Sequence, residues 1–118
     1  MKILITDDSA TMRRIIIKNL DAAGYNDIIE AENGEEALTK LAGIDLVLTD
    51  WNMPVMDGLT MVKTIRANDA YKDLPIMMIT SQAAQKEVIE ALKNGVNDYI
   101  IKPFTPSFLI EKVKNLIG

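Results

Sequence analysis

Short runs of β-favouring residues alternate with longer stretches of helical periodicity along the chain, and this order limits the folds open to it. We predict strands at residues 3–6, 27–30, 46–49, 76–80 and 98–101. The runs at 3–6, 46–49 and 76–80 are almost continuously apolar, as is typical of parallel strands covered on both faces, whereas the polar run at 27–30 suits a sheet edge. Strands and helices in this order predict an α/β fold, with helices on both faces of a parallel sheet.

Apolar residues recur at every third or fourth position between the predicted strands, which indicates amphipathic helices. Ser9, Asn33 and Thr105 are predicted N-caps, and Gly24 is predicted to end the first helix. The side chains in these predicted apolar stripes are Met12, Ile15, Ile16 and Leu20; Leu59, Val62 and Ile65; Val88, Ile89 and Leu92; and Leu109, Val113 and Leu116.

The composition removes several classes of chemistry. The chain has 118 residues, and we expect residues 1–118 to form one domain. It contains no cysteine and no histidine, which excludes thiolate and imidazole ligands or nucleophiles. With 13 basic and 17 acidic residues the formal charge is −4, which argues against a nucleic-acid partner. Neither a signal peptide nor a run of roughly 20 apolar residues is found, so we expect a cytoplasmic protein without membrane insertion.

Polar residues follow four of the predicted strands. Asp7 and Asp8 follow the first, Asp50 the third, Thr80 and Ser81 end the fourth, and Lys102 follows the fifth. In a parallel sheet the carboxyl ends of the strands share one edge, where ligands bind at the point where the strand order reverses. We therefore expect these side chains to meet in one crevice.

Three carboxylates in one crevice need a compensating charge. At an effective dielectric constant near 20, two of them about 4 Å apart repel by roughly 4 kcal/mol, and Lys102 offsets one charge. With oxygen ligands and no His or Cys, the expected cation is Mg²⁺. Such a site suits a phosphoryl group, and Asp50 is the expected nucleophile because aspartate can form an acyl phosphate.

Each of these motifs also has a simpler explanation when it is taken alone. Asp7 and Asp8 could be acids of a first helical turn, favoured by the helix dipole. Asp50 could start a turn, Thr80 and Ser81 could cap a helix, and Lys102 could be a solvated lysine. The functional interpretation depends on all four motifs lying at strand ends of one fold.

Four segments, LITDDS, TDWNMPVMDG, MMITS and DYIIKPF, resemble in order and spacing the receiver domains of two-component response regulators. The resemblance covers the whole chain. It implies a flavodoxin-like (CheY-like) three-layer sandwich whose five parallel strands have the order 2-1-3-4-5. It also implies a signalling switch rather than an enzyme acting on other molecules.

The resemblance assigns a role to each residue of the expected crevice. Asp50 resembles the phosphoacceptor that takes a phosphoryl group from a histidine kinase, and Thr80 and Lys102 resemble the residues that hold phosphoryl oxygens. The Lys102–Pro103 peptide bond is expected to be cis. The implied Mg²⁺ ligands are Asp7, Asp8, Asp50 and the backbone carbonyl of Asn52.

The family also suggests how the signal leaves the site. Tyr99 occupies the position of the switch aromatic, which turns inward when Thr80 moves toward the phosphoryl group. Val88, Tyr99 and Lys112 are expected to lie together on a partner-binding face. Trp51 directly after the phosphoacceptor, together with Tyr99, resembles the stand-alone members that act in chemotaxis, so the expected partner is a flagellar motor switch protein, bound by a monomer.

Other functions stay open at this point. The chain could instead be a phosphorelay intermediate that passes its phosphoryl group to another histidine protein. An aspartyl-phosphate phosphatase usually has a second acid two residues after the nucleophile, where this chain has Asn52. A flavin carrier shares the topology, but acidic strand ends would repel its phosphate. Thr6, Ser81 and Gln82 depart from the commoner residues of the family and could tune the lifetime of the phosphoryl group.

Overall fold

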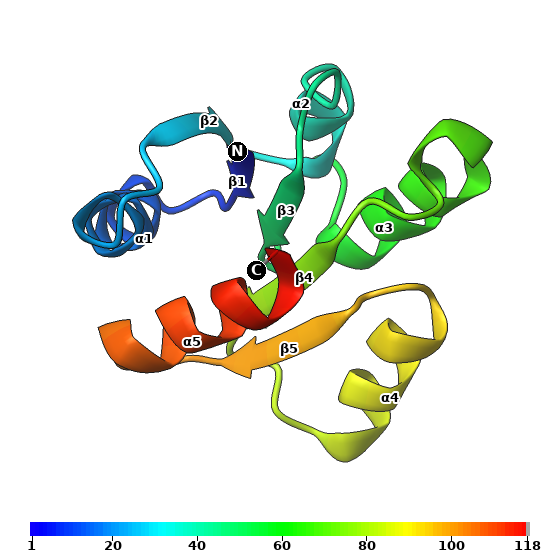
Figure 1. Ribbon diagram of the computed structural model, residues 1–118. Coiled ribbons are helices and arrows are strands. Elements are labelled where there is room, and N and C mark those ends of the chain that lie inside the picture. The colour runs from blue at the N-terminus through cyan, green and yellow to red at the C-terminus, as the bar shows by residue number, and fades with distance from the viewer. Residues whose placement is uncertain (118) are drawn as a thin grey trace.

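A computed structural model, which describes residues 1–117, contains a five-stranded parallel sheet flanked by helices (Figure 1). The strand order is β2-β1-β3-β4-β5, which confirms the predicted flavodoxin-like topology. No helix within residues 1–117 is long and apolar enough to cross a lipid bilayer. The elements are β1 (Lys2–Thr6), α1 (Ala10–Ala22), β2 (Asp27–Ala31), α2 (Gly34–Leu38), β3 (Leu46–Thr49), α3 (Gly58–Ala67), the short 3-10 helix η1 (Asp69–Tyr71), β4 (Ile76–Thr80), α4 (Gln85–Lys93), β5 (Asp98–Ile101) and α5 (Pro106–Ile117).

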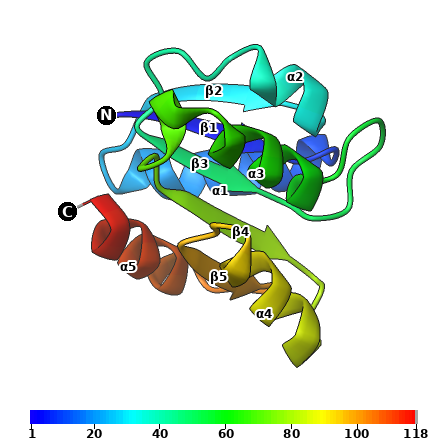
Figure 2. The same ribbon diagram turned by 90° about the vertical axis from the view of Figure 1, so that its right-hand side faces the viewer.

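The helices divide between the two faces of the sheet. Helices α1 and α5 lie on one side, and α2, α3 and α4 lie on the other, in front of the sheet in Figure 2. Successive side chains of a strand point to opposite faces, so each strand serves both layers. In β1, for example, Ile3 and Ile5 pack with α1 and α5, while Leu4 packs with the opposite layer.

The three central strands are buried as their sequences predict. All residues of β3 and β4 are buried, and so are residues 3–6 of β1. The edge strand β2 is more exposed, which agrees with its polar sequence. The predicted caps are also confirmed: the hydroxyl of Ser9 and the side-chain oxygen of Asn33 accept backbone N–H bonds, and Thr105 Oγ1 accepts from the N–H of Phe108.

The prediction that the apolar stripes face the core is wrong at three positions. Ile15, Ile89 and Leu92 are 43%, 42% and 45% exposed. In α1 the buried contacts come from Ile16 and Leu20, and Ile15 lies about 100° around the helix from Ile16, at the margin of the stripe. In α4 the buried residue is the small Ala91, so the larger aliphatic side chains of this helix remain accessible.

The connection between β3 and α3 contains an unusual backbone conformation. Val55 has a φ of 69° and is 73% exposed. A left-handed conformation brings the Cβ of an L-residue close to the carbonyl oxygen, and a β-branched residue tolerates it poorly. Because the exposed side chain of Val55 gains little from packing, the chain carries this strain in a loop beside the sheet edge.

We expect Val55→Asn to raise the free energy of unfolding by about 1 kcal/mol, because Asn tolerates the left-handed region. Urea denaturation measures the change. Val55→Ile is the matched control: it keeps the β-branch and should leave stability within about 0.5 kcal/mol of the parent. An Asn variant no more stable than the Ile variant would show that Val55 is unstrained in solution.

Candidate functional site

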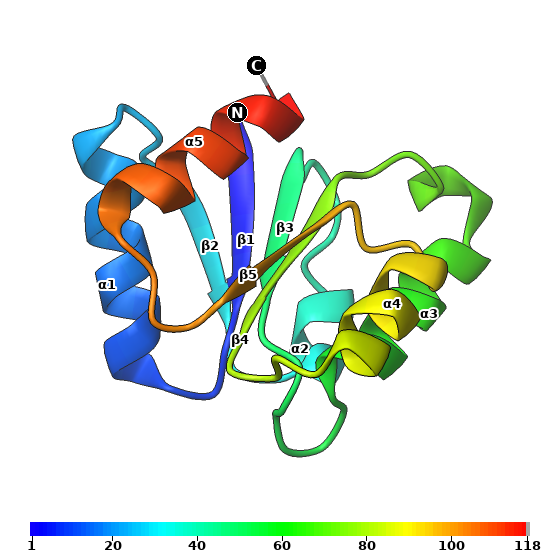
Figure 3. The same cartoon turned by 90° about the horizontal axis from the view of Figure 1, so that it is seen from below.

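Three carboxylates converge at the carboxyl edge of the sheet. The carboxylate oxygens of Asp7, Asp8 and Asp50 approach within 4.8 Å of one another. Figure 3 shows the β1–α1 and β3–α3 connections, which carry them, at the same lower edge. Asp7 is buried, Asp50 is half-buried and Asp8 is exposed, so the cluster opens to solvent on the Asp8 side. The predicted convergence is therefore present for the three carboxylates.

Lys102 bridges two of these carboxylates from the end of β5. Its Nζ donates to Asp7 Oδ2 at 3.0 Å and to Asp50 Oδ2 at 2.9 Å. Burial opposes the charged amine, but the hydrogen bonds to Asp50 and Asp7 outweigh it, so the pKa of Lys102 lies above its ordinary value. The following peptide bond, Lys102–Pro103, is cis as expected.

Asp7 is the least accessible member of the cluster. Burial raises its pKa above the ordinary value, although hydrogen bonds from the Ser9 N–H and Lys102 act in the opposite direction. A folded-state pKa above the unfolded value means that ionised Asp7 costs folding free energy at neutral pH. A cation bound to the cluster would reduce that cost.

Asp50 is fixed by the loop that follows it. Its Oδ1 accepts the backbone N–H of Trp51 at 2.6 Å, while its Oδ2 contacts Lys102. The loop then returns so closely that a Cβ at Gly58 would lie 2.0 Å from the carbonyl oxygen of Asp50. Gly58 also donates its N–H to the Trp51 carbonyl at 2.7 Å. A residue without a side chain is required here for the loop to close.

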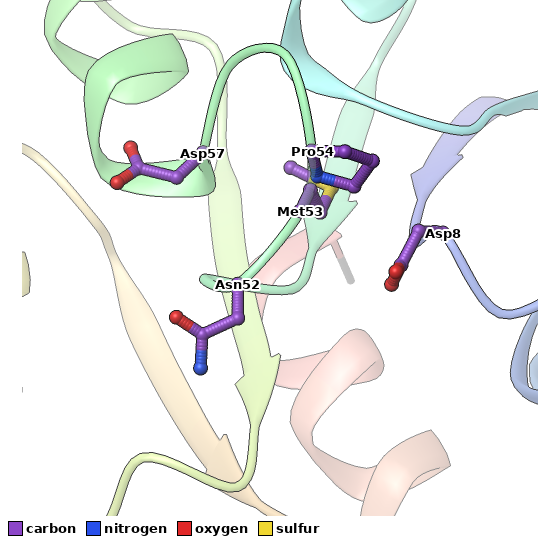
Figure 4. A pocket seen from close by; sticks show the side chains of 5 residues that line it. All are labelled: Asp8, Asn52, Met53, Pro54 and Asp57. Carbon is purple, nitrogen blue, oxygen red and sulfur yellow. The ribbon is translucent and has the colours of Figure 1, made fainter.

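The β3–α3 loop and Asp8 border a hollow of about 510 Å³ (Figure 4). Asn52, the residue whose carbonyl is the predicted fourth metal ligand, lies on this hollow with Asp8. Asp57 also borders it, but its carboxylate points away from Asp8 in Figure 4 and caps α3 by accepting the N–H of Thr60 at 2.8 Å. Asp57 is thus a structural acid, distinct from the three clustered carboxylates.

A polar bridge runs from this loop to α4 through Gln82. In the amide orientation that satisfies both neighbours, Gln82 Nε2 donates to the Glu87 carboxylate and its Oε1 accepts from Asn52 Nδ2. Gln82, one of the positions where the sequence departs from the commoner residues of the family, thus contacts Asn52, which borders the hollow.

Thr80 and Tyr99, the predicted switch residues, both contact Gln82. Thr80 is buried, and its Oγ1 accepts the Gln82 N–H at 3.3 Å. The Tyr99 ring packs against the core on the α3 and α4 side, and its hydroxyl donates to the Gln82 carbonyl at 2.7 Å. Burial, with smaller effects from Glu87 and Asp50, raises the pKa of Tyr99 to about 12. Tyr99 is therefore half-buried, and the Gln82 carbonyl holds its hydroxyl. The inward turn that we expect when Thr80 moves toward a phosphoryl group stays a prediction.

The predicted partner-binding residues lie around β5 but on different sides of it. Tyr99 packs on the α4 side, whereas Lys112 on α5 donates to Asp98 Oδ1 at 3.3 Å and lies over the Phe108 ring. Val88 is half-buried on α4. The three residues therefore lie on three neighbouring elements, α4, β5 and α5, and their joint role in binding a partner stays a prediction. The exposed apolar residues on these elements are Ile89, Leu92, Ile101 and Phe108.

Sequence reasoning missed one charged residue next to the cluster. Arg13, on α1, is buried, and its guanidinium contacts the Asp7 carbonyl and the Glu30 carboxylate. Its spacing from Asp7 and Glu30 in the sequence gives no signal for this arrangement. Thr6, noted as a departure from the family, has a buried hydroxyl without a hydrogen-bond partner among the described residues.

The donor set fits a hard divalent cation. All three clustered ligands are carboxylates, their oxygens are close enough to share one ion, and the exposed Asp8 leaves a path from solvent. Oxygen-only donors with room for water are typical of Mg²⁺ sites. The residues of the cluster could therefore hold such an ion.

Comparison with known proteins agrees with this geometry. Residues 3–114 match the family described as the response regulator receiver domain. The chain is 52% identical to a Chemotaxis protein CheY homolog of Campylobacter jejuni, with 100% of this chain and 93% of that one aligned. It is 53% identical to Chemotaxis protein CheY1 of Helicobacter pylori, over 100% of this chain and 98% of that one.

Solved structures give the same result. Chemotaxis response regulator CheY4 of Vibrio cholerae superposes with a TM-score of 0.90 at 35% identity, covering 98% of this chain and 97% of that chain. A putative response regulator from Chloroflexus aurantiacus has a TM-score of 0.92 at 36% identity, covering 98% and 96%. The chain therefore belongs to the response regulator receiver domain family, as a CheY-like chemotaxis response regulator.

Proposed function

We propose that the chain works as one receiver domain that takes a phosphoryl group from a histidine kinase onto Asp50 in a Mg²⁺-dependent reaction. The observation that carries the proposal is the placement of Lys102 between Asp7 and Asp50, within a cluster of three carboxylates at the strand ends. A structural salt bridge to Lys102 would need only one carboxylate, but Lys102 contacts two, Asp7 and Asp50. The additional, exposed carboxylate of Asp8 suits a site that receives a cation and an anionic group.

The proposed transfer is a substitution at phosphorus. A carboxylate oxygen of Asp50 forms a bond to the phosphorus atom while the phosphorus–nitrogen bond of the donor phosphohistidine breaks, and the nitrogen keeps the electron pair. Mg²⁺ on Asp7, Asp8, Asp50 and the Asn52 carbonyl would supply charge neutralisation. Lys102 already donates to Asp50 and would also donate to a phosphoryl oxygen. The Thr80 hydroxyl, whose oxygen accepts the Gln82 N–H, would donate its own hydrogen to another phosphoryl oxygen.

The proposed output is altered binding to a flagellar motor switch protein. Two observations support it: the similar proteins carry chemotaxis names, and apolar side chains are exposed beside Tyr99 on α4, β5 and α5. No observation favours the phosphorelay alternative. We further propose that the protein acts as a cytoplasmic monomer and catalyses only its own phosphorylation and dephosphorylation.

Asp50→Asn should abolish phosphorylation by acetyl phosphate in Mg²⁺, because the amide nitrogen and oxygen do not replace a carboxylate nucleophile. Intact mass spectrometry should show one added phosphoryl group on the parent. Asp57→Asn is the matched control, since Asp57 lies in the same loop but caps α3, and it should still be labelled. Labelling of the Asp50→Asn variant at the parent rate would place the nucleophile elsewhere.

Mg²⁺ should stabilise the folded chain by mass action. At about 100 times the Kd, the free energy of unfolding should rise by about 2.7 kcal/mol, measured by urea denaturation. Asp8→Asn should move this response to higher Mg²⁺ concentration. Asp69→Asn removes an exposed charge far from the cluster and should leave the response unchanged. An equal response in the Asp8→Asn variant and the parent would remove Asp8 from the ion's ligands.

Thr80→Ala should keep phosphorylation of Asp50 but lose most of the tightening toward a motor-switch peptide. Such coupling typically amounts to about 5- to 150-fold in affinity, and linkage requires the peptide to favour phosphorylation equally. Fluorescence anisotropy of a labelled peptide measures its affinity for the phosphorylated and the unphosphorylated protein. Ser81→Ala, at the exposed neighbouring hydroxyl, is the control. Equal tightening in the Thr80→Ala variant and the parent would exclude this route.

A further inference from the structure

Arg13 makes two contacts that tie the start of α1 to the acidic cluster. Its Nη1 donates to the backbone carbonyl of Asp7 at 2.6 Å, and its Nε donates to Glu30 Oε1 on β2 at 2.9 Å. The residue is 9% exposed. One guanidinium thus joins α1, the end of β1 and the edge strand β2, three elements that lie side by side in Figure 3.

The position of Arg13 in α1 calls for a specific reason. It is the fourth residue of the helix, near the N-terminal end, where the helix dipole disfavours a cation. Burying a charged group is also costly unless its donors are bonded. A fixed, planar fork can reach a carboxylate and a carbonyl together, which the point charge of a lysine does less well. The two contacts offset both costs.

The contacts of Asp7 show what Arg13 holds in place. The Asp7 N–H donates to Ala31 at 3.1 Å, and its carboxylate accepts from Ser9 and Lys102. The bond from Arg13 adds a side-chain contact to the backbone carbonyl, at the peptide that joins Asp7 to Asp8. Rotation of that peptide would swing the two carboxylates relative to Asp50.

We propose that Arg13 is a positioning residue for the acidic site: by holding the Asp7 carbonyl, it fixes Asp7 and Asp8 in the geometry that binds Mg²⁺. The inference rests on the proposed Mg²⁺ site and adds to it a residue outside the ligand set. Partners that orient metal ligands in this way commonly change metal affinity by about 10- to 100-fold when they are removed.

The sign of the effect separates positioning from charge. A cation close to the cluster repels Mg²⁺, so its removal should tighten Mg²⁺ binding if charge alone matters. If Arg13 positions the ligands, its removal should weaken binding instead. Arg14, the next residue of α1, is exposed and provides the same charge change without the contacts.

The test is a titration with Mg²⁺ in which the fluorescence of Trp51 reports binding. Trp51 is the residue directly after Asp50 in the sequence. Arg13→Met should raise the half-saturating Mg²⁺ concentration by roughly 10-fold. Arg14→Met should leave it unchanged or lower it slightly. Arg13→Lys, which keeps the charge but not the fork, should lie between the parent and Arg13→Met. At saturating Mg²⁺, the rate of phosphorylation by acetyl phosphate should return to the parent value in every variant.

The outcomes are separable. Equal titrations of Arg13→Met and the parent, or a shared shift in Arg13→Met and Arg14→Met, would overturn the role of Arg13. Urea denaturation in EDTA identifies any variant that is unfolded, and Arg13→Lys then carries the comparison. If the parent itself neither binds Mg²⁺ nor accepts a phosphoryl group, the proposed function fails. A responsive parent with an unaffected Arg13→Met rejects only the positioning role.

Discussion

Mutual repulsion among three carboxylates is the constraint on which the rest of this structure depends. Two unit charges about 5 Å apart repel by roughly 3 kcal/mol at an effective dielectric constant near 20, and the clustered oxygens of Asp7, Asp8 and Asp50 lie within 4.8 Å. Lys102 compensates part of this cost by contacting Asp7 and Asp50 together. Burial first, and repulsion from Asp50 to a smaller extent, raise the pKa of Asp7, so its ionisation costs more free energy in the folded chain than in the unfolded one. Binding of a cation at the site would therefore relieve repulsion among the carboxylates and stabilise the folded chain.

The sheet order supplies the rigidity that holds these charges together. Thr6 and Thr49 are paired in register on β1 and β3, so the acids that follow them leave adjacent, buried strands. Lys102 starts two strands away, across a separation of about 10 Å at ordinary strand spacing. Its long side chain crosses the end of β4, where Thr80 is the last strand residue. A bulky residue at that strand end would stand in its path.

Much of this arrangement could be predicted from the sequence, because short apolar runs indicate the buried strands and the polar residues directly after them indicate the site. The buried runs of β1, β3 and β4 identified the central strands, and the residues after them identified the cluster. What the sequence could not provide depends on neighbours distant along the chain. The prediction of burial was wrong at Ile15 and Ile89, which lie at the margins of their helices' apolar stripes. Helical periodicity does not reveal how wide a strip of each helix contacts the sheet. The contacts of Arg13 could not be predicted because its partners, Asp7 and Glu30, belong to other segments of the chain.

Gln82, in the loop after β4, makes different contacts with its backbone and with its side chain. Its backbone carbonyl accepts the Tyr99 hydroxyl, while its side chain joins Asn52 to Glu87. With a pKa of about 12, the phenol of Tyr99 stays protonated near neutral pH and keeps donating that bond. Because every residue type has a backbone carbonyl, the side chain at this position is free to vary without removing the acceptor for Tyr99. Variation there changes instead the side-chain link between Asn52 of the β3–α3 loop and Glu87 of α4, and it leaves in place the hydrogen bond that holds the Tyr99 hydroxyl.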